Sequence, residues 1–326
     1  MNGTIKTIVI ATSLRDESDA VVCAGADAAR AAGARAWLVH AFPPQAIPTG
    51  IGSIDSHWVA EQLEWQASEV RAKLAAQARS TGLASLPGFR QEQLFPVLGS
   101  PRRAVVDAAR TLNADLIVIG AAEGGALKKM LLGSTADGVI RRASCPVLVV
   151  RSEMALPPAR VEIAVDLSPL SAGVLREGLR VLLALGGSAK QAAALFVLSP
   201  IDLRLSPDFT SEQVERFARQ ELGRLVEANR VGEAPRLELR TGEPREGILA
   251  ALAETKADLA ILGTHGRSGF DRLLLGSVAS EVMRLAGCNL LVVPPEASLR
   301  HPGAEQVGAD WQYVPDEVAA PAPVGA

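Results

Sequence analysis

The chain has 326 residues, of which 48% are hydrophobic and 4% aromatic, and its formal net charge is −3. A length near that of two ordinary domains, with apolar residues that are mostly Ala, Leu and Val, predicts an α/β protein with substantial buried cores. The weak negative charge argues against binding to the backbone of DNA or RNA, which requires a strong basic field.

No apolar run approaches the roughly 20 residues that a membrane-spanning helix needs, and the first residues lack the pattern of a signal peptide. The three cysteines, Cys23, Cys145 and Cys288, have neither metal-ligand spacing nor a neighbouring histidine cluster. We therefore expect a cytoplasmic protein with reduced thiols and no membrane partner.

Short, β-branched apolar runs alternate with helical stretches along the chain. The predicted strands of the first half are Ile5–Thr12, Ala36–Ala41, Gln93–Val97, Asp115–Gly120 and Pro146–Arg151. Those of the second half are Arg160–Asp166, Ala193–Leu198, Arg236–Arg240, Asp258–Gly263 and Asn289–Pro294. Strands alternating with helices predict an α/β fold with two doubly wound parallel sheets.

Two helices carry clear sequence signals. One is expected to have Ser168 as its N-cap and Pro169 as its first residue, with Gly186 after its end. The other places five apolar side chains on one stripe: Val214, Phe217, Ala218, Leu222 and Leu225. The segments "PQAIPTGIGSID" and "PIDLRLSPDF" are expected to be irregular loops.

The chain contains an internal repeat of a whole domain. "NADLIVIG" matches "KADLAILG", "GSPR" matches "GEPR" and "CPVLVV" matches "CNLLVV", each pair 143 residues apart. This predicts one domain over 1–152, a second over 157–298 and a disordered Pro/Ala/Gly-rich tail over 299–326. Because each final strand would leave a bare edge, we expect the two units to pack as an intramolecular pseudo-dimer through these strands. A further homodimer remains an open alternative.

The most informative stretch is "GTHGRSGFDRLLLGS", from Gly263 to Ser277. Glycines at a strand end allow positive φ or close approach of a ligand, and Gly-Ser at a helix start offers backbone N–H groups to an anion. His265 and Arg267 add donors. The plain alternative is a turn before a helix. Asp166, at the end of another strand, can contact ribose or adenine, or only cap the following helix.

This stretch resembles the motif of nucleotide-binding universal stress proteins: Gly, two residues, Gly, nine residues, then Gly-Ser or Gly-Thr. Gly263, Gly266, Gly276 and Ser277 fit that spacing. The resemblance covers nearly all of residues 4–296 and implies a five-stranded parallel sheet per unit in the order 3-2-1-4-5. It also implies ATP as ligand, with Mg²⁺ as a candidate companion ion. The implied site consists of Ala164, Asp166, Val197, Leu262, Gly263, His265, Gly266, Gly276, Ser277 and Val278.

The first unit departs from this pattern at two positions. Ser13 stands where the second unit has Asp166, and Glu123 stands where it has Gly266. At about 4 Å, two like unit charges repel by roughly 4 kcal/mol at an effective dielectric constant of 20, which weakens binding by about three powers of ten. Lys128 and Lys129 can compensate, but we expect the first unit to be structural or regulatory.

Three functions are compatible with the sequence. The first is a regulatory ATP-binding protein with little or no catalysis and with a protein partner that the sequence does not identify. The second is an enzyme, either a slow ATP hydrolase or an adenylating enzyme of a related fold, although the P-loop lysine is missing and a phosphate hydrogen bond is enough to explain His265. The third is an interaction scaffold that nucleotide stabilises. No metal site or catalytic residue is predicted.

Overall fold

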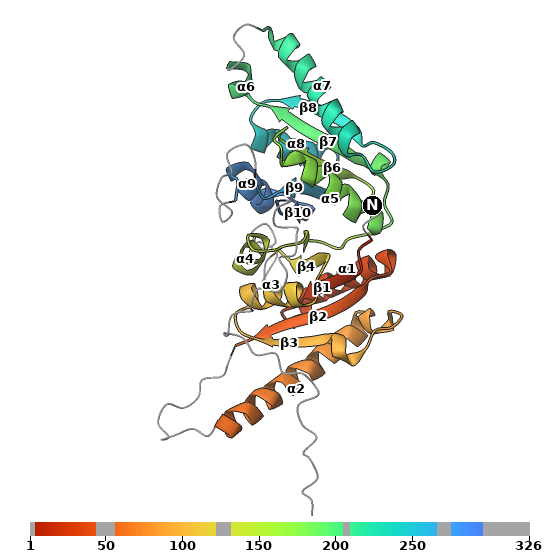
Figure 1. Cartoon of the computed structure of the whole chain (residues 1–326), viewed down its shortest axis with the longest axis vertical. Helices are drawn as coiled ribbons and strands as arrows, with labels where there is room; N and C mark the ends of the chain where they lie inside the picture. The colour runs from red at the N-terminus through yellow and green to blue at the C-terminus, as the bar shows by residue number, and fades with distance from the viewer. Residues whose placement is uncertain (1–3, 44–55, 122–131, 205–208, 266–274, 296–326) are drawn as a thin grey trace, which may run out of the picture.

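The computed structural model describes residues 4–43, 56–121, 132–204, 209–265 and 275–295. The two halves of the chain form one elongated body, with a single ten-stranded sheet running through it and helices on both faces (Figure 1). Within the described part of the chain, no helix is both long enough and apolar enough to cross a membrane.

Each half contributes five strands to this sheet. In the first half they are β1 (Thr7–Ala11), β2 (Arg35–Phe42), β3 (Leu94–Leu98), β4 (Leu116–Gly120) and β5 (Val147–Val150). In the second half they are β6 (Val161–Val165), β7 (Ala192–Leu198), β8 (Arg236–Thr241), β9 (Leu259–Gly263) and β10 (Asn289–Val293). All ten lie where the apolar runs predict them, because continuous β-branched segments favour strands that are covered on both faces.

The helices connect the parallel strands within each half, as crossovers do in doubly wound sheets. The first half has α1 (Asp19–Ala32), α2 (Ser56–Ser80), α3 (Pro101–Thr111) and α4 (Ser134–Ile140). The second half has α5 (Ser171–Ala184), α6 (Pro200–Arg204), α7 (Ser211–Asn229), α8 (Pro244–Glu254) and α9 (Ser277–Leu285).

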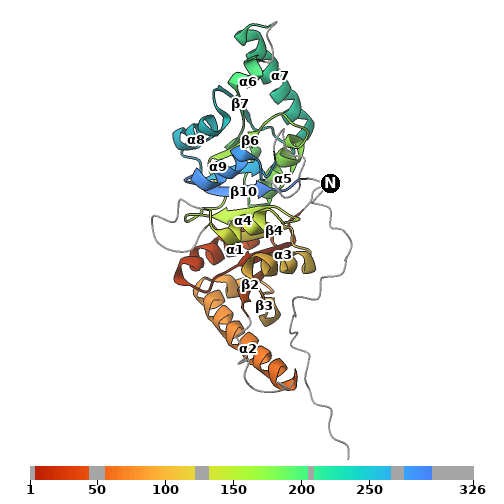
Figure 2. The same cartoon turned by 90° about the vertical axis from the view of Figure 1, so that its left-hand side faces the viewer.

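The strand order is β3-β2-β1-β4-β5-β10-β9-β6-β7-β8. Each half therefore has the order 3-2-1-4-5, counted from its own first strand. The two five-stranded sheets expected from the sequence are joined into one, because β5 and β10 pair antiparallel, with Val147 opposite Val292 and Val149 opposite Leu290. The expected pairing of the final strands is thus confirmed, and the halves meet at this seam (Figure 2).

Alternation along the strands divides the core into two layers. On β1, Ile8 and Ile10 pack on the side of α1, α2, α5 and α7, whereas Val9 packs on the side of α3, α4, α8 and α9. Cys145 and Cys288 are buried in the second layer, and burial raises the pKa of these thiols to about 12 and about 11.

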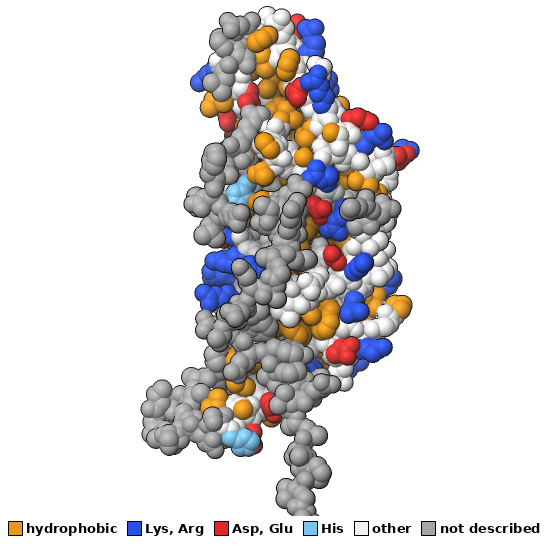
Figure 3. Space-filling model, viewed as in Figure 1, with side chains coloured by type: hydrophobic (Ala, Val, Ile, Leu, Met, Phe, Trp, Pro, Cys, Tyr) orange, Lys and Arg blue, Asp and Glu red, His pale blue; other side chains and the backbone are white. Residues whose placement is uncertain are grey.

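Three local predictions differ from the structure. Helix α5 begins at Ser171, not at Pro169, because the preceding residues form a turn held by Asp166. Part of "PIDLRLSPDF" forms the short helix α6, and the segment 44–55 lies outside the described residues. Phe217 leaves the buried stripe of α7: it is 62% exposed and lines an apolar hollow of about 370 Å³ between α7 and the end of β7. Hydrophobic side chains gather on the surface at this end of the molecule (Figure 3).

Candidate functional site

The predicted site residues come from the ends of neighbouring strands. β6 and β9 are adjacent and parallel, with Ile163 opposite Ile261, so the residues that follow these strands emerge at one edge of the sheet. Helix α9 starts from the same edge, and β7 lies on the other side of β6. In open α/β sheets, ligands bind at the carboxyl ends of the strands.

Asp166 follows β6 directly, and its carboxylate is held in place by neighbouring groups. Its Oδ1 accepts hydrogen bonds from the backbone N–H of Ser168 at 3.0 Å and from the hydroxyl of Ser171 at 2.8 Å. The Ser171 hydroxyl oxygen also accepts the backbone N–H of Asp166 at 3.1 Å. The side chain thus organises the turn before α5, and its orientation is set before any ligand arrives.

This turn contains a left-handed residue that is not glycine. Leu167 has φ = 59°, and its counterpart in the first half, Leu14, has the same value. A bulky residue with positive φ is strained, and such strain persists only where surrounding contacts hold it. Here the Asp166–Ser168 bond does so in the second half, and a bond of 3.1 Å from the Leu14 N–H to the Thr12 hydroxyl does so in the first.

Gly263 ends β9 and packs closely against α5. A Cβ atom there would lie 2.9 Å from Cγ2 of Val174, which is below any normal contact. Gly263 does not have positive φ, so the absence of a side chain serves close packing and not an unusual backbone conformation. The positive φ expected of this strand-end glycine is therefore absent, and its close approach to a ligand stays a prediction.

The loop of the motif is closed at its base by backbone hydrogen bonds. Thr264 N–H donates to the carbonyl of Val293 at 3.2 Å, and Gly276 N–H donates to the carbonyl of Thr264 at 2.9 Å. His265 is half-buried, and its Nδ1 lies 2.8 Å from the Thr264 hydroxyl. Because Gly276 bonds to the residue before His265, His265 and Gly276 lie close to each other.

Gly276 is the N-cap of α9, and no acidic residue stands in the first turn of this helix. Ser277 is exposed and Val278 is half-buried. The N–H groups of the first turn and the positive end of the helix dipole make this terminus suitable for an anion.

The remaining predicted residues are apolar or lie outside the described ranges. Ala164, Leu262 and Val278 belong to one apolar cluster. Val197 belongs to a separate small cluster under α8, where a Cβ on Gly247 would come within 2.9 Å of it. Gly266 lies outside the described residues.

The first half reproduces the frame of this site. Gly133 N–H donates to the carbonyl of Ala121 at 2.6 Å, and Gly133 is the N-cap of α4. Ala121 and Ala122 stand in the positions of Thr264 and His265, so the hydroxyl–imidazole contact has no equivalent. Glu123 lies outside the described residues.

Helix α4 also differs from α9 in charge. Asp137 occupies its first turn and forms an ion pair of 2.8 Å with Arg141, whereas Ser280 occupies the equivalent position in α9. A carboxylate near the start of α4 opposes the approach of an anion to this terminus.

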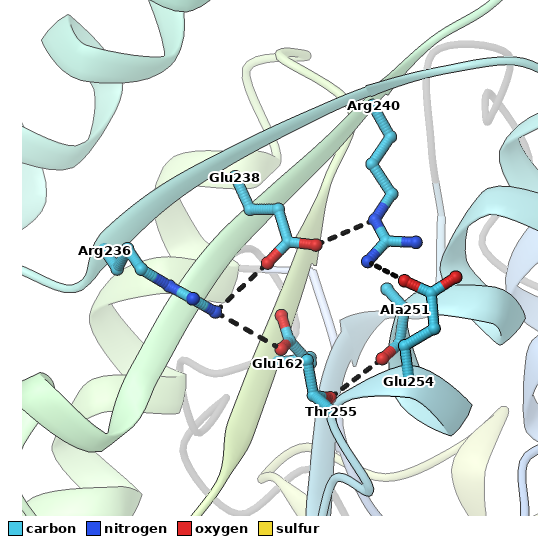
Figure 4. Close-up of polar contacts among 7 residues, drawn as sticks. All are labelled: Glu162, Arg236, Glu238, Arg240, Ala251, Glu254 and Thr255. Atoms are coloured by element: carbon cyan, nitrogen blue, oxygen red, sulfur yellow. Dashed lines mark hydrogen bonds and ion pairs between the residues drawn. The ribbon is translucent and has the colours of Figure 1, made fainter.

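A second polar cluster surrounds Glu162 of β6 (Figure 4). Because side chains alternate along a strand, Glu162 lies on the same face of β6 as Ala164. Glu162 is 3% exposed, its Oε2 has no hydrogen-bond partner among the described residues, and its Oε1 is 3.8 Å from Nη2 of Arg236. Burial, reinforced by the nearby Glu238, raises the pKa of the Glu162 carboxyl to about 7.

The charges next to Glu162 continue along β8 to the end of α8. Arg236 pairs with Glu238 at 3.1 Å, Glu238 with Arg240 at 2.7 Å and Arg240 with Glu254 at 2.9 Å (Figure 4). Among the described residues, the first half has no equivalent of this network. Val9 stands in the position of Glu162, and Gln93, Phe95 and Val97 stand in the positions of Arg236, Glu238 and Arg240. The two halves thus differ in polarity beneath the site as well as within it.

The sequence did not indicate the supporting roles of Ser171 and Thr264. Both are short hydroxyl residues next to predicted site residues, one orienting Asp166 and one contacting His265. The available signal was the repeat itself, because Ser18 matches Ser171 whereas Ala121 replaces Thr264.

Comparisons with known proteins agree with this architecture. The model of the universal stress protein family matches the chain twice, over residues 4–151 and 159–294. A universal stress protein of Mycobacterium bovis is 26% identical over 298 residues, covering 85% of this chain and 92% of that protein. One from Mycolicibacterium smegmatis is 29% identical over 306 residues, covering 88% and 97%.

Solved structures show the same fold. The crystal structure of a universal stress protein from Archaeoglobus fulgidus has a TM-score of 0.60 to this chain at 20% sequence identity, covering 88% of this chain and 98% of that one. Two family-model matches span most of the polypeptide and coincide with the two halves of the sheet. The chain therefore belongs to the universal stress protein family.

Proposed function

We propose that the second half binds an adenine nucleotide, ATP in the first instance, at the edge of the sheet where β6 and β9 end. The observation that carries this proposal is the convergence of an oriented carboxylate, Asp166, with the N-terminus of α9 across two adjacent parallel strands. A carboxylate suits ribose hydroxyls, and a helix N-terminus suits phosphate.

The residues have complementary roles in this proposal. Asp166 accepts hydrogen bonds from the ribose hydroxyl groups, and the apolar cluster that contains Ala164 and Leu262 supports the adenine ring. The backbone N–H groups at Ser277 and Val278, together with His265, donate to the phosphates. Val197, beneath α8, adds an apolar contact to the adenine pocket. By their place in the motif, Gly263, Gly266 and Gly276 let the phosphates pass close to the backbone.

Mg²⁺ would be held mainly by the nucleotide. Among the described residues, no group of three or more His, Cys, Asp or Glu side chains is arranged to hold a metal ion. Mg²⁺ in nucleotide sites commonly keeps several water ligands and binds phosphate oxygens with few protein ligands. The described donors suit the phosphates, so the metal would arrive as part of the nucleotide complex.

The first half is proposed to bind nucleotide weakly or not at all. Ser13 supplies no carboxylate, Ala121 removes the hydroxyl next to the loop, and Asp137 places a negative charge in the first turn of α4. Each difference removes a favourable contact or adds repulsion to a phosphate. One nucleotide per chain is therefore expected.

Binding without rapid turnover is the function that we favour, because the contacts assigned above would hold ribose and phosphates and the sequence lacks the lysine of a P-loop. ATP binding would then shift the population from the free state to the liganded state, and a protein partner would respond to that shift, as it does to a sensor. A steady-state turnover of about 1 s⁻¹ or more in stringently purified protein would favour the ATP hydrolase alternative. Partner capture that is identical with and without ATP would favour the scaffold alternative.

The deciding experiment identifies the ligand directly. Mass spectrometry of the nucleotide that copurifies with the intact chain should detect an adenine nucleotide. Calorimetric titration of the stripped protein should then give one ATP per chain. A stripped, folded protein that binds neither ATP, ADP nor AMP contradicts the proposal.

A further inference from the structure

The seam between the halves contains two contacts that its pseudo-twofold symmetry does not repeat. Arg151 follows the last strand of the first half, and its Nη2 donates a hydrogen bond to the backbone carbonyl of Met283 in α9. Asn289 begins β10, and its Oδ1 accepts the backbone N–H groups of Arg151 at 2.8 Å and Ser152 at 3.2 Å. The residues 143 positions from Arg151 and Asn289 are Pro294 and Pro146.

Neither proline can reproduce these contacts, because proline has no side-chain donor or acceptor. The C-terminal part of α4 is instead capped from within its own half, where Arg142 Nη1 donates to the carbonyl of Gly138 at 3.1 Å. Helix α9 thus receives a guanidinium from the opposite half, whereas the guanidinium of Arg142 on α4 comes from the same half. It is also the helix whose N-terminus belongs to the more complete motif.

The carbonyl of Met283 lies in the last turn of α9, where helix carbonyls lack partners within the helix. The neighbouring carbonyl of Val282 accepts the N–H of Ala286 at 2.8 Å. A cation at this end stabilises the helix dipole, and an anion at the other end stabilises the same dipole. Because α9 has only nine residues, an anchor at its C-terminus lies close enough to restrain its N-terminal N–H groups as well, in addition to the bond from Gly276 N–H to the carbonyl of Thr264.

We infer that Arg151, supplied by the first half, is a positioning residue for the phosphate-binding end of α9 in the second half. The half with the degenerate motif then completes the site of the other half, which gives it a role beyond forming the seam. This inference rests on the proposed nucleotide function, but its structural part, the ordering of α9, can be measured without nucleotide.

The test compares Arg151→Gln, Arg151→Met and Arg151→Lys with Arg142→Gln as the matched control. The control removes an arginine that caps the equivalent helix of the first half. ATP affinity, measured by calorimetry at a temperature where each variant is folded, should fall about fivefold or more in Arg151→Gln and Arg151→Met. Arg151→Lys keeps the charge and a donor, so its ATP affinity should be close to that of the unmodified chain. The ATP affinity of Arg142→Gln should be unchanged.

Hydrogen exchange in the ligand-free proteins separates this inference from the proposed function. The backbone amides of Ser277–Leu285 should exchange about fivefold faster in Arg151→Gln or Arg151→Met than in Arg142→Gln. If the unmodified chain binds no adenine nucleotide, the proposed function fails, and faster exchange would still support the ordering of α9 by Arg151. Equal exchange and equal affinity in the Arg151 and Arg142 variants, or no recovery in Arg151→Lys, would overturn the inference.

Discussion

The carboxylate of Asp166 accepts a hydrogen bond from the hydroxyl group of Ser171 at 2.8 Å, across the turn between β6 and α5. A residue proposed to meet the nucleotide therefore also holds the local fold. Its two roles can be separated, because an amide retains the acceptor oxygen but not the charge.

Asp166→Asn should weaken ATP binding strongly while leaving the free energy of unfolding nearly unchanged. The amide oxygen would still accept the bonds from Ser168 and Ser171, but it would be a weaker acceptor for ribose. Asp166→Ala should lose binding and about 1–2 kcal/mol of stability, because both bonds disappear. Calorimetry and urea denaturation measure the two effects. Undiminished ATP binding by Asp166→Asn would exclude a ligand role for this carboxylate.

Glu162 should make the stability of the protein depend on pH. Burial raises the pKa of its carboxyl in the folded state to about 7 from an ordinary value of 4.5. Between these values the unfolded chain loses a proton that the folded chain keeps, so stability falls as pH rises from about 4.5 to 7. The full loss is about 3 kcal/mol, and it persists at higher pH.

Urea denaturation at several pH values tests this linkage. Glu162→Gln removes the titrating group, so its free energy of unfolding should no longer fall between about pH 4.5 and 7. Near pH 8 the variant should therefore be more stable than the unmodified chain. Glu254→Gln is the control, because Glu254 belongs to the same charge network but is 64% exposed at its side chain. Identical pH profiles for Glu162→Gln and the unmodified chain would show that Glu162 does not titrate in this range.

Gly263→Ala should destabilise the protein by about 1–3 kcal/mol, because the new Cβ meets the Val174 side chain at 2.9 Å. Val174→Ala in the same chain should recover part of the loss by making space. Gly120→Ala is the matched change in the first half, where Val21 lies 3.1 Å away, and it should cost less. Thermal unfolding gives the order of the variants. A Gly263→Ala protein as stable as the unmodified one would refute the packing argument.

Exchange of the distinguishing residues between the halves tests the assignment of the site. Gly266→Glu should reduce ATP affinity by about a thousandfold through charge repulsion. Glu123→Gly combined with Ser13→Asp is expected to restore some binding to the first half. Calorimetric stoichiometry should read one ATP per unmodified chain and none for Gly266→Glu. Two nucleotides per unmodified chain would contradict the proposed asymmetry.

Much of the fold follows from local sequence patterns. The buried strands appear as continuous apolar runs, and the repeat, at a spacing of 143 residues for β3, β4 and β5 and of 153 residues for β1, locates their counterparts in the second half. The prediction of α5 was less accurate, because Asp166 and the left-handed Leu167 delay the helix start to Ser171. Phe217 fits the apolar period of α7 but lies beyond the surface that the helix buries.

The sequence by itself determined the duplicated α/β units, the positions of their strands and the motif from Gly263 to Ser277, because each depends on periodicity or spacing along the chain. Tertiary structure alone decided that Arg151 reaches Met283 and that Glu162 is buried beside Arg236. These contacts join residues far apart in sequence, so no local pattern encodes them. They arise because antiparallel pairing of β5 with β10 merges two sheets and because crossover topology places β8 and α8 near β6.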